Sequence, residues 1–169
     1  ADVMLQQLNR KQNEANVFLC NATTGDAKKI YEEKSDTWID IIPTQGNGWR
    51  WINGGKEFLW ISEKDGWRHL YRIAANGEKE TVITKGDYDM ISLKAVDEKS
   101  GHVYFMASPA NATQQYLYRT PLNGRGKLEL LSPADQQGTH SYTLSPTGQY
   151  GNHNFSNHKN QRVGEWVSF

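Results

Sequence analysis

Cysteine and long apolar runs are scarce in this chain of 169 residues. The single cysteine, Cys20, excludes an intramolecular disulfide framework and any zinc site built from several cysteines. Its apolar neighbours predict that it is a small buried hydrophobe. The longest apolar run, the five residues from Val103 to Ala107, is far too short to cross a bilayer, so we expect no membrane span.

Net charge is also absent, because 19 basic side chains balance 19 acidic ones. A protein that binds nucleic acid needs a positive surface to displace the counterions of the phosphates, so we expect no nucleic-acid partner. The mean hydropathy is low, at −0.77, but aromatic residues make up 11% of the chain. Disordered chains are poor in aromatic residues and rich in net charge, so this composition indicates a folded protein.

The apolar residues follow a strand-like pattern along the whole chain. Short β-branched or aromatic runs such as Asn16–Cys20 and Lys29–Tyr31 alternate with turn residues such as Thr24–Asp26. No window of 11 or more residues keeps the apolar stripe of an amphipathic helix. The sequence therefore predicts an all-β protein.

A unit of about 45 residues repeats along the chain. Leu70-Tyr71-Arg72 recurs 47 positions later as Leu117-Tyr118-Arg119, and the pairs Asn76-Gly77 and Asn123-Gly124 are separated by the same distance. Each unit reads as four short strands joined by a glycine turn, a variable loop and an Asn-Gly turn, which supplies the positive φ of a tight hairpin. Four strands per repeat of this length are typical of a β-propeller blade, and a repeated β-sandwich is the alternative.

We therefore predict a partial β-propeller of four-stranded antiparallel blades. Two complete blades are expected at 43–88 and 89–138, with partial blades at 1–42 and 139–169, and Pro43–Gly48 is expected to be a glycine-rich connection. The chain begins and ends in strand-like sequence, which we interpret as a piece of a longer polypeptide. Because blades cut from a ring expose unpaired strand edges and apolar faces, we expect a homo-oligomer to form through those edges.

Several motifs resemble one known family. The segment Ser62–Tyr71, with Phe58–Ile61 before it and Ile83–Asp89 after it, resembles the N-terminal propeller of dipeptidyl peptidase IV, a member of the prolyl oligopeptidase group of serine peptidases. Leu8–Asn13, Thr37–Asp40 and His140–Gly148 resemble the same family in the same order, and the likeness is greatest to its bacterial branch, which includes the prolyl tripeptidyl peptidases.

The resemblance implies a parent enzyme with an approximately eight-bladed propeller and an α/β-hydrolase domain. Such an enzyme removes di- or tripeptides from the N-terminus of a peptide substrate, with proline favoured at the cleaved position, and its propeller restricts access to the active site. The resemblance also implies a periplasmic or cell-surface location. The rival hypothesis is an exported, non-catalytic propeller that binds peptides or glycans through exposed aromatic side chains, and a third is a propeller that serves only as a scaffold.

No catalytic residue is expected within this chain. Serine acyl transfer needs a nucleophile on a tight elbow, and the pattern Gly-x-Ser-x-Gly occurs nowhere in the sequence. Ser145 precedes Pro146 and lies near Gly148, which predicts a β-turn rather than a nucleophile elbow. We therefore expect the chain alone to be inactive and to hold no cofactor.

The adjacent carboxylates Glu32 and Glu33 resemble the glutamate pair with which the family binds the free α-amino group of its substrates. In the family that pair lies on a short helical insertion of an earlier blade, whereas here it ends a strand. We therefore interpret both residues as a solvated strand end, flanked by Lys29 and Lys34, and do not assign them that role.

The histidines give no metal-binding pattern. His153 and His158 are five residues apart, a spacing that fixes no common ligand geometry, and His69, His102 and His140 fall at varied points of the repeats. We expect no metal site and interpret His69 as a packed or strand-surface residue.

The tryptophans could form a binding platform for a sugar or a peptide, but packing between blades also requires large flat side chains. We predict core packing for Trp49, Trp51, Trp60 and Trp67, and leave Trp38 and Trp166 open.

Overall fold

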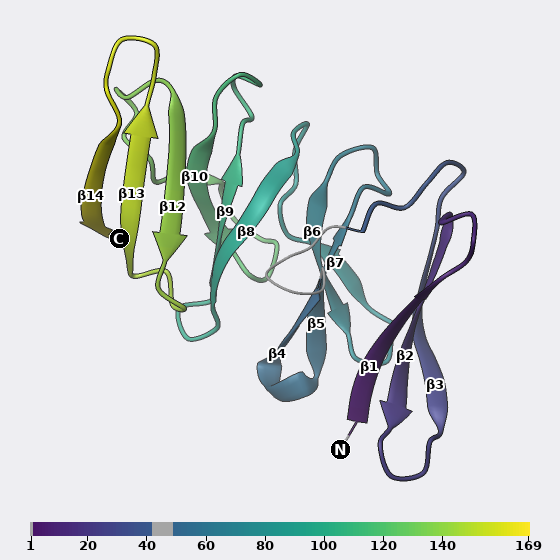
Figure 1. The fold of residues 1–169 in the computed structure, drawn as a ribbon. Helices are drawn as coiled ribbons and strands as arrows, with labels where there is room; N and C mark the ends of the chain where they lie inside the picture. The colour runs from purple at the N-terminus through teal and green to yellow at the C-terminus, as the bar shows by residue number, and fades with distance from the viewer. Residues whose placement is uncertain (1, 42–48) are drawn as a thin grey trace.

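Four antiparallel β-sheets make up the chain, which the computed structural model describes over residues 2–41 and 49–169 (Figure 1). These residues form strands, turns and one short 3-10 turn, and no α-helix is present among them. The prediction of an all-β protein is confirmed. The predicted connection Pro43–Gly48 lies outside the described residues.

The sheets follow one another along the chain, and each is a meander whose neighbouring strands are consecutive in sequence. The first sheet consists of β1 (Asp2–Leu8), β2 (Glu14–Asn21) and β3 (Ala27–Lys34). The second consists of β4 (Trp49–Ile52), which leads into the 3-10 turn η1 (Asn53–Gly55), and then β5 (Glu57–Ser62), β6 (His69–Ala74) and β7 (Glu80–Val82).

The third sheet repeats this plan with β8 (Met90–Asp97), β9 (His102–Ala107), β10 (Tyr116–Pro121) and β11 (Glu129–Leu130). The fourth consists of β12 (Thr139–Leu144), β13 (Tyr150–Ser156) and β14 (Val163–Ser168). Figure 1 shows the four sheets standing side by side in sequence order, from the purple first sheet to the yellow end of the fourth.

The core lies in layers between successive sheets. The central strands β5 and β9 are buried almost throughout, because a sheet in the middle of the row is covered on both faces. Phe58, Trp60 and Tyr71 pack against the first sheet, whereas Leu59 and Ile61 face the third. Alternate residues of one strand therefore serve two different core layers, as the period of two in a strand requires.

Two Asn-Gly turns, one between β6 and β7 and the other between β10 and β11, each pack against the preceding sheet. Gly77, with φ of +78°, lies so close to β3 that a Cβ atom there would stand 1.7 Å from the carbonyl oxygen of Ile30. Gly124, with φ of +68°, lies in the same way against β7, and its Cβ would stand 2.5 Å from the carbonyl oxygen of Val82. Glycine thus meets two requirements at each turn, because it allows the hairpin conformation and lets the next sheet approach the backbone of the previous one.

Candidate functional site

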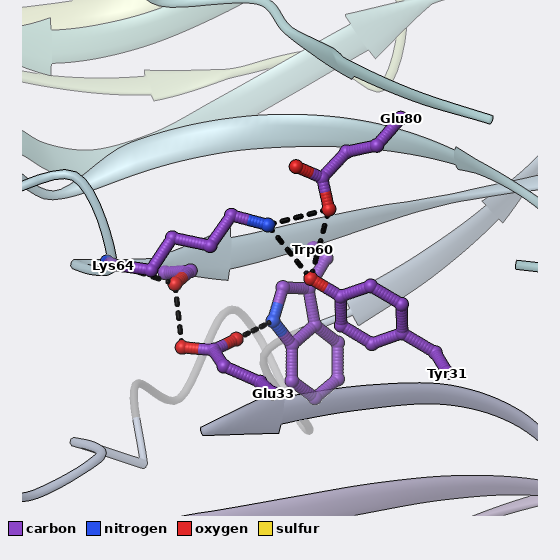
Figure 2. Close-up of polar contacts among 6 residues, drawn as sticks. Tyr31, Glu33, Trp60, Lys64 and Glu80 are labelled. Carbon is purple, nitrogen blue, oxygen red and sulfur yellow. Dashed lines mark hydrogen bonds and ion pairs between the residues drawn. The ribbon is translucent and has the colours of Figure 1, made fainter. Parts of the chain in front are cut away.

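Polar side chains gather where the first and second sheets meet (Figure 2). The strand β3 carries a β-bulge: Val17 pairs with Tyr31 while Phe18 pairs with Lys29, so Ile30 is an extra residue without a partner in the ladder. Beyond the bulge, Tyr31 contacts the rings of Phe58 and Trp60 edge-on, with its centroid 5.7 Å from that of Trp60. Glu33, two residues further on, reaches the same strand, β5.

Glu33 is a buried carboxylate that bonds the two sheets together. Only 6% of it is exposed. Its Oε2 accepts a hydrogen bond from Trp60 Nε1 at 2.6 Å, and its Oε1 accepts one from Ser62 Oγ at 2.5 Å. Both oxygens therefore have donors, and both donors come from β5. Figure 2 shows the bond from Trp60 to Glu33.

Lys64, Tyr31 and Glu80 form a second set of polar contacts beside those of Glu33. Lys64 Nζ is 2.5 Å from Glu80 Oε2 and donates to the Tyr31 hydroxyl at 2.8 Å, while that hydroxyl donates to Glu80 at 2.9 Å (Figure 2). The ammonium group also stands 4.2 Å from the centroid of the Tyr71 ring. Burial raises the pKa of the Tyr31 hydroxyl, and the Glu80 carboxylate raises it further, so Tyr31 stays neutral and keeps its donor.

A hollow of about 270 Å³ opens next to Glu33. Arg68 crosses it, held by Glu63 at 2.7 Å and by Asp40 at 3.2 Å, while Asp89 accepts the backbone N–H of Arg68 at 2.7 Å. The lining is polar and contains more carboxylates than cationic groups. Two of these carboxylates, those of Asp40 and Glu63, are already paired with the guanidinium group of Arg68. The residues that line the hollow are Glu33, Ser35, Thr37, Trp38, Ile39, Asp40, Ser62, Glu63, Lys64, Gly66, Arg68 and Asp89.

The interpretation of Glu32 and Glu33 as one solvated strand end is wrong for Glu33. Glu32 is partly exposed and forms ion pairs with Lys29 at 2.5 Å and Lys34 at 2.6 Å, which lower the pKa of its carboxyl to about 2. Glu33 instead turns inward, because the bulge at Ile30 shifts the alternation of the strand by one residue. The two carboxylates therefore point to different surroundings, and neither has an oxygen left without a strong donor.

Ser145 lies in a tight turn between β12 and β13. Its N–H donates to the carbonyl of Tyr150 at 2.8 Å, and its Oγ accepts from the N–H of Tyr150 at 3.2 Å. No histidine is among these partners. The chemistry of this serine is therefore that of a turn residue.

The five histidines do not gather around one point. His69 is buried, with Nδ1 3.2 Å from Thr84 Oγ1, whereas His158 is exposed. His153 lies 2.8 Å from His140, a pairing across β12 and β13 that the sequence analysis missed. Among residues 2–41 and 49–169, no group of three or more His, Cys, Asp or Glu side chains is arranged to hold a metal ion.

The aromatic residues divide into packed and exposed sets. Trp60 is buried, and Trp49 and Trp51 pack half-buried against the same cluster. The prediction of core packing is wrong for Trp67, which is 40% exposed because it lies in the loop before β6 rather than on the strand. Trp38 and Trp166 are 63% and 82% exposed.

Cys20 is half-buried rather than buried, since β2 is only partly covered from Phe18 onward. None of the elements in the described part of the chain is a helix long and apolar enough to cross a bilayer.

Comparison with known proteins gives a consistent picture. A family model described as the N-terminal region of dipeptidyl peptidase IV matches residues 1–162. Dipeptidyl peptidase 4 of Arthroderma otae is 26% identical over 149 residues, which cover 88% of this chain and 19% of that protein. Dipeptidyl peptidase 4 of Trichophyton rubrum is 28% identical over 120 residues, which cover 69% of this chain and 15% of that protein.

Comparison with solved structures also finds a dipeptidyl peptidase 4. The crystal structure of dipeptidyl peptidase 4 from Porphyromonas gingivalis superimposes with a TM-score of 0.84 at 25% identity, over 99% of this chain and 23% of that one. This likeness, together with the four antiparallel sheets, confirms the predicted partial β-propeller. The chain spans less than a fifth of the length of the curated relatives it matches.

Proposed function

The chain belongs to the dipeptidyl peptidase IV N-terminal family, and from this membership we propose that it is the propeller part of a serine exopeptidase that removes N-terminal di- or tripeptides. The observation that carries the proposal is the family match over residues 1–162 on a row of four sheets. In the proposed enzyme, proline is favoured at the cleaved position, and the serine, aspartate and histidine of catalysis lie outside this chain. Residues 1–42, 43–88, 89–138 and 139–169 supply blades or parts of blades.

The role of the chain in that enzyme is to limit access to the active site. A wall that admits short peptides and rejects long ones must keep its shape, so neighbouring blades need contacts that resist sliding. Glu33 supports this role, because its two hydrogen bonds to β5 fix the end of β3 against the second sheet. The hydrogen bonds of the Tyr31 hydroxyl with Lys64 and Glu80 and the close approach of Gly77 to Ile30 act at the same boundary.

Recognition of the substrate's α-amino group is not assigned to this chain's glutamate pair. Glu32 is neutralised by two lysines, and Glu33 is buried against Trp60 and Ser62. A free ammonium group would have to displace partners at both residues, which gives it no advantage over water.

The experiment is hydrolysis of a glycyl-prolyl chromogenic substrate by the longer polypeptide that carries this chain. We expect chromophore release from the free dipeptide and from a tripeptide ending in proline, and none from the N-acetylated dipeptide. Equal cleavage of the acetylated substrate, or no cleavage of any of them, would overturn the proposal.

A second candidate function is supported by the exposed tryptophans. Trp38 and Trp166 present large aromatic faces that suit a peptide or a sugar ring. An exported, non-catalytic propeller would bind such a ligand without cleaving it, and alanine at both positions would abolish the binding. For either function we propose a periplasmic or cell-surface location, which cell fractionation tests.

A further inference from the structure

Two buried histidines face each other in the fourth sheet. His140 on β12 is 0% exposed and His153 on β13 is 1% exposed. Nδ1 of His140 lies 2.8 Å from Nε2 of His153, so one hydrogen bond joins the rings and the two nitrogens share one proton. Because this contact is buried, neither ring can turn to water for a different partner.

The outer nitrogens of the pair also have fixed partners. Nε2 of His140 lies 2.7 Å from the carbonyl oxygen of Gln136, in the loop before β12. Nδ1 of His153 lies 2.9 Å from Oε1 of Glu165 on β14. A carbonyl only accepts, so Nε2 of His140 carries a hydrogen, and a carboxylate also only accepts, so Nδ1 of His153 carries one too.

These partners fix the number of protons on the pair. Four ring nitrogens hold three hydrogens: one faces Gln136, one lies between the rings, and one faces Glu165. Two neutral imidazoles carry only two hydrogens, so the arrangement contains one imidazolium. With His140 donating from Nε2 and accepting at Nδ1, the imidazolium is His153, and the carboxylate of Glu165 neutralises it.

We propose that this pair is an acid-sensitive latch: in acid a further proton, arriving at Nδ1 of His140, opens the hydrogen bond between the histidines. Both facing nitrogens would then carry hydrogens, and two donors 2.8 Å apart repel. His140 would have to move away, and its bond to Gln136 would be lost with it. The proposal concerns this sheet alone and does not depend on the enzymatic function.

The surroundings make the second proton costly. Tyr116 from β10 and Tyr142 from β12 flank His140, with ring centroids at 5.0 Å and 6.4 Å, and the Tyr142 ring is stacked 4.4 Å from that of His153. The acidic partner in contact with the pair is Glu165, on the side of His153. Burial lowers the pKa of His140, and the charge on His153 lowers it further, against the opposing effect of the Gln136 carbonyl. Burial raises the pKa of Tyr142, so its hydroxyl stays neutral at the pH of the latch.

The element that the latch controls is the loop before β12. Gln136 belongs to this loop and lines a polar hollow of about 470 Å³ together with Gly138, Thr139 and Asn157. His140 fixes the loop through its bond to Gln136, and Asn157 fixes it through a bond to the carbonyl of Gln137 at 3.0 Å. Opening the latch removes one of these two attachments, so the loop and the hollow should loosen together in acid.

Hydrogen–deuterium exchange of the full-length polypeptide at about pH 7.5 and about pH 5, on either side of the ordinary histidine pKa, tests the proposal. The exchange rates are corrected for the intrinsic effect of pH. We then expect the protection factors of segments 133–141 and 150–156 to be at least about tenfold lower at about pH 5 than at about pH 7.5. A tenfold change in an equilibrium constant corresponds to one pKa unit. Unchanged protection across this range would overturn the latch.

Three variants separate the latch from a general effect of acid. His153→Gln keeps an amide donor toward His140 without a titrating ring, so it should show the same protection at both pH values. His158→Gln changes the exposed histidine and should behave like the wild type. If His153→Gln is unprotected at both pH values, the same exchange measurement on Glu165→Gln tests the latch instead. Without the carboxylate of residue 165 the histidine pair gains protons less readily, so protection should be lost at a lower pH than in the wild type. A fall in His153→Gln as large as in the wild type, or an unshifted transition in Glu165→Gln, would contradict the proposal.

Discussion

Replacement of Gly77 by alanine should separate the first sheet from the second. The new Cβ would lie 1.7 Å from the carbonyl oxygen of Ile30, whereas real Cβ atoms essentially never approach another heavy atom within 3.0 Å. Both sides of this contact are backbone, so no side-chain rotation relieves it. The turn and β3 must move apart by more than an ångström, which disturbs the layer that contains Phe58 and Tyr71.

The cost of Gly77→Ala has two parts. Alanine at a φ of +78° costs about 1 kcal/mol from the left-handed backbone alone. Forcing a packed layer apart adds about 1–3 kcal/mol, by analogy with overpacked cores. We therefore expect a total loss of about 3 kcal/mol in the free energy of unfolding.

Gly101 provides the matched control. Its φ of +72° is similar, but nothing lies within 4 Å of the position its Cβ would take, so Gly101→Ala should cost only the backbone part, about 1 kcal/mol. In a thermal melt followed by near-ultraviolet circular dichroism, Gly77→Ala should lower Tm by about 6–12 °C and Gly101→Ala by about 2–4 °C. Equal shifts in the two variants would refute the argument that Gly77 is an inter-sheet contact.

Three further results are expected from the same physical reasoning. Glu33→Ala leaves the N–H of Trp60 and the O–H of Ser62 buried without an acceptor, so urea denaturation should show a loss of about 2–4 kcal/mol, whereas Glu32→Gln at the exposed ion pairs should shift the urea midpoint far less. Lys64→Met removes the ion pair with Glu80 but keeps the apolar stem, so the same assay should show a loss of about 1 kcal/mol, and a gain in stability would contradict the assignment. Because burial lowers the pKa of His140, the unfolded chain takes up a proton that the folded chain refuses; stability should be full above about pH 6.5 and decrease as the pH falls below it, and a urea midpoint that rises in acid would oppose this.

The repeat explains why so much of the fold could be predicted. Leu70-Tyr71-Arg72 and Leu117-Tyr118-Arg119 lie on the equivalent strands β6 and β10, and the Asn-Gly pairs after them form equivalent turns. When a motif recurs at a constant spacing, the second copy supports the strand or turn assigned to the first, because a chance pattern does not recur in register. The strand period and the turn glycines were therefore sufficient for the architecture.

The candidate site was harder to predict because one extra residue decides it. The bulge at Ile30 leaves no clear mark in the sequence, yet it determines that Glu33 faces β5 rather than water. The pairing of His140 with His153 depends in a similar way on the register of β12 against β13, which the single-strand pattern does not give. Both histidines do lie at inward positions of their strands, two residues from Tyr142 and Phe155, and that was the available signal.

Exposure at strand ends also escaped the sequence analysis. Trp67 precedes β6 by two residues and lies in a loop, although its type and its neighbours suggested a strand. An aromatic residue next to a turn fits the sequence pattern of a core strand whether it is the first residue of the strand or the last residue of the loop before it. The residue at which a strand begins depends on the hydrogen bonds of the loop before it. Here the backbone N–H of Arg68 donates to the carboxylate of Asp89 rather than to a neighbouring strand.

We propose that these sheets form a rigid wall that limits which substrates reach a peptidase site. The most direct measurement compares, for the full-length polypeptide, cleavage of a short peptide and of a large folded protein with the same proline-containing N-terminus. We expect rapid release from the short peptide, little release from the folded protein, and a smaller difference between them in Gly77→Ala, where the boundary between two sheets is loosened. Equal rates on both substrates in the wild type would contradict it.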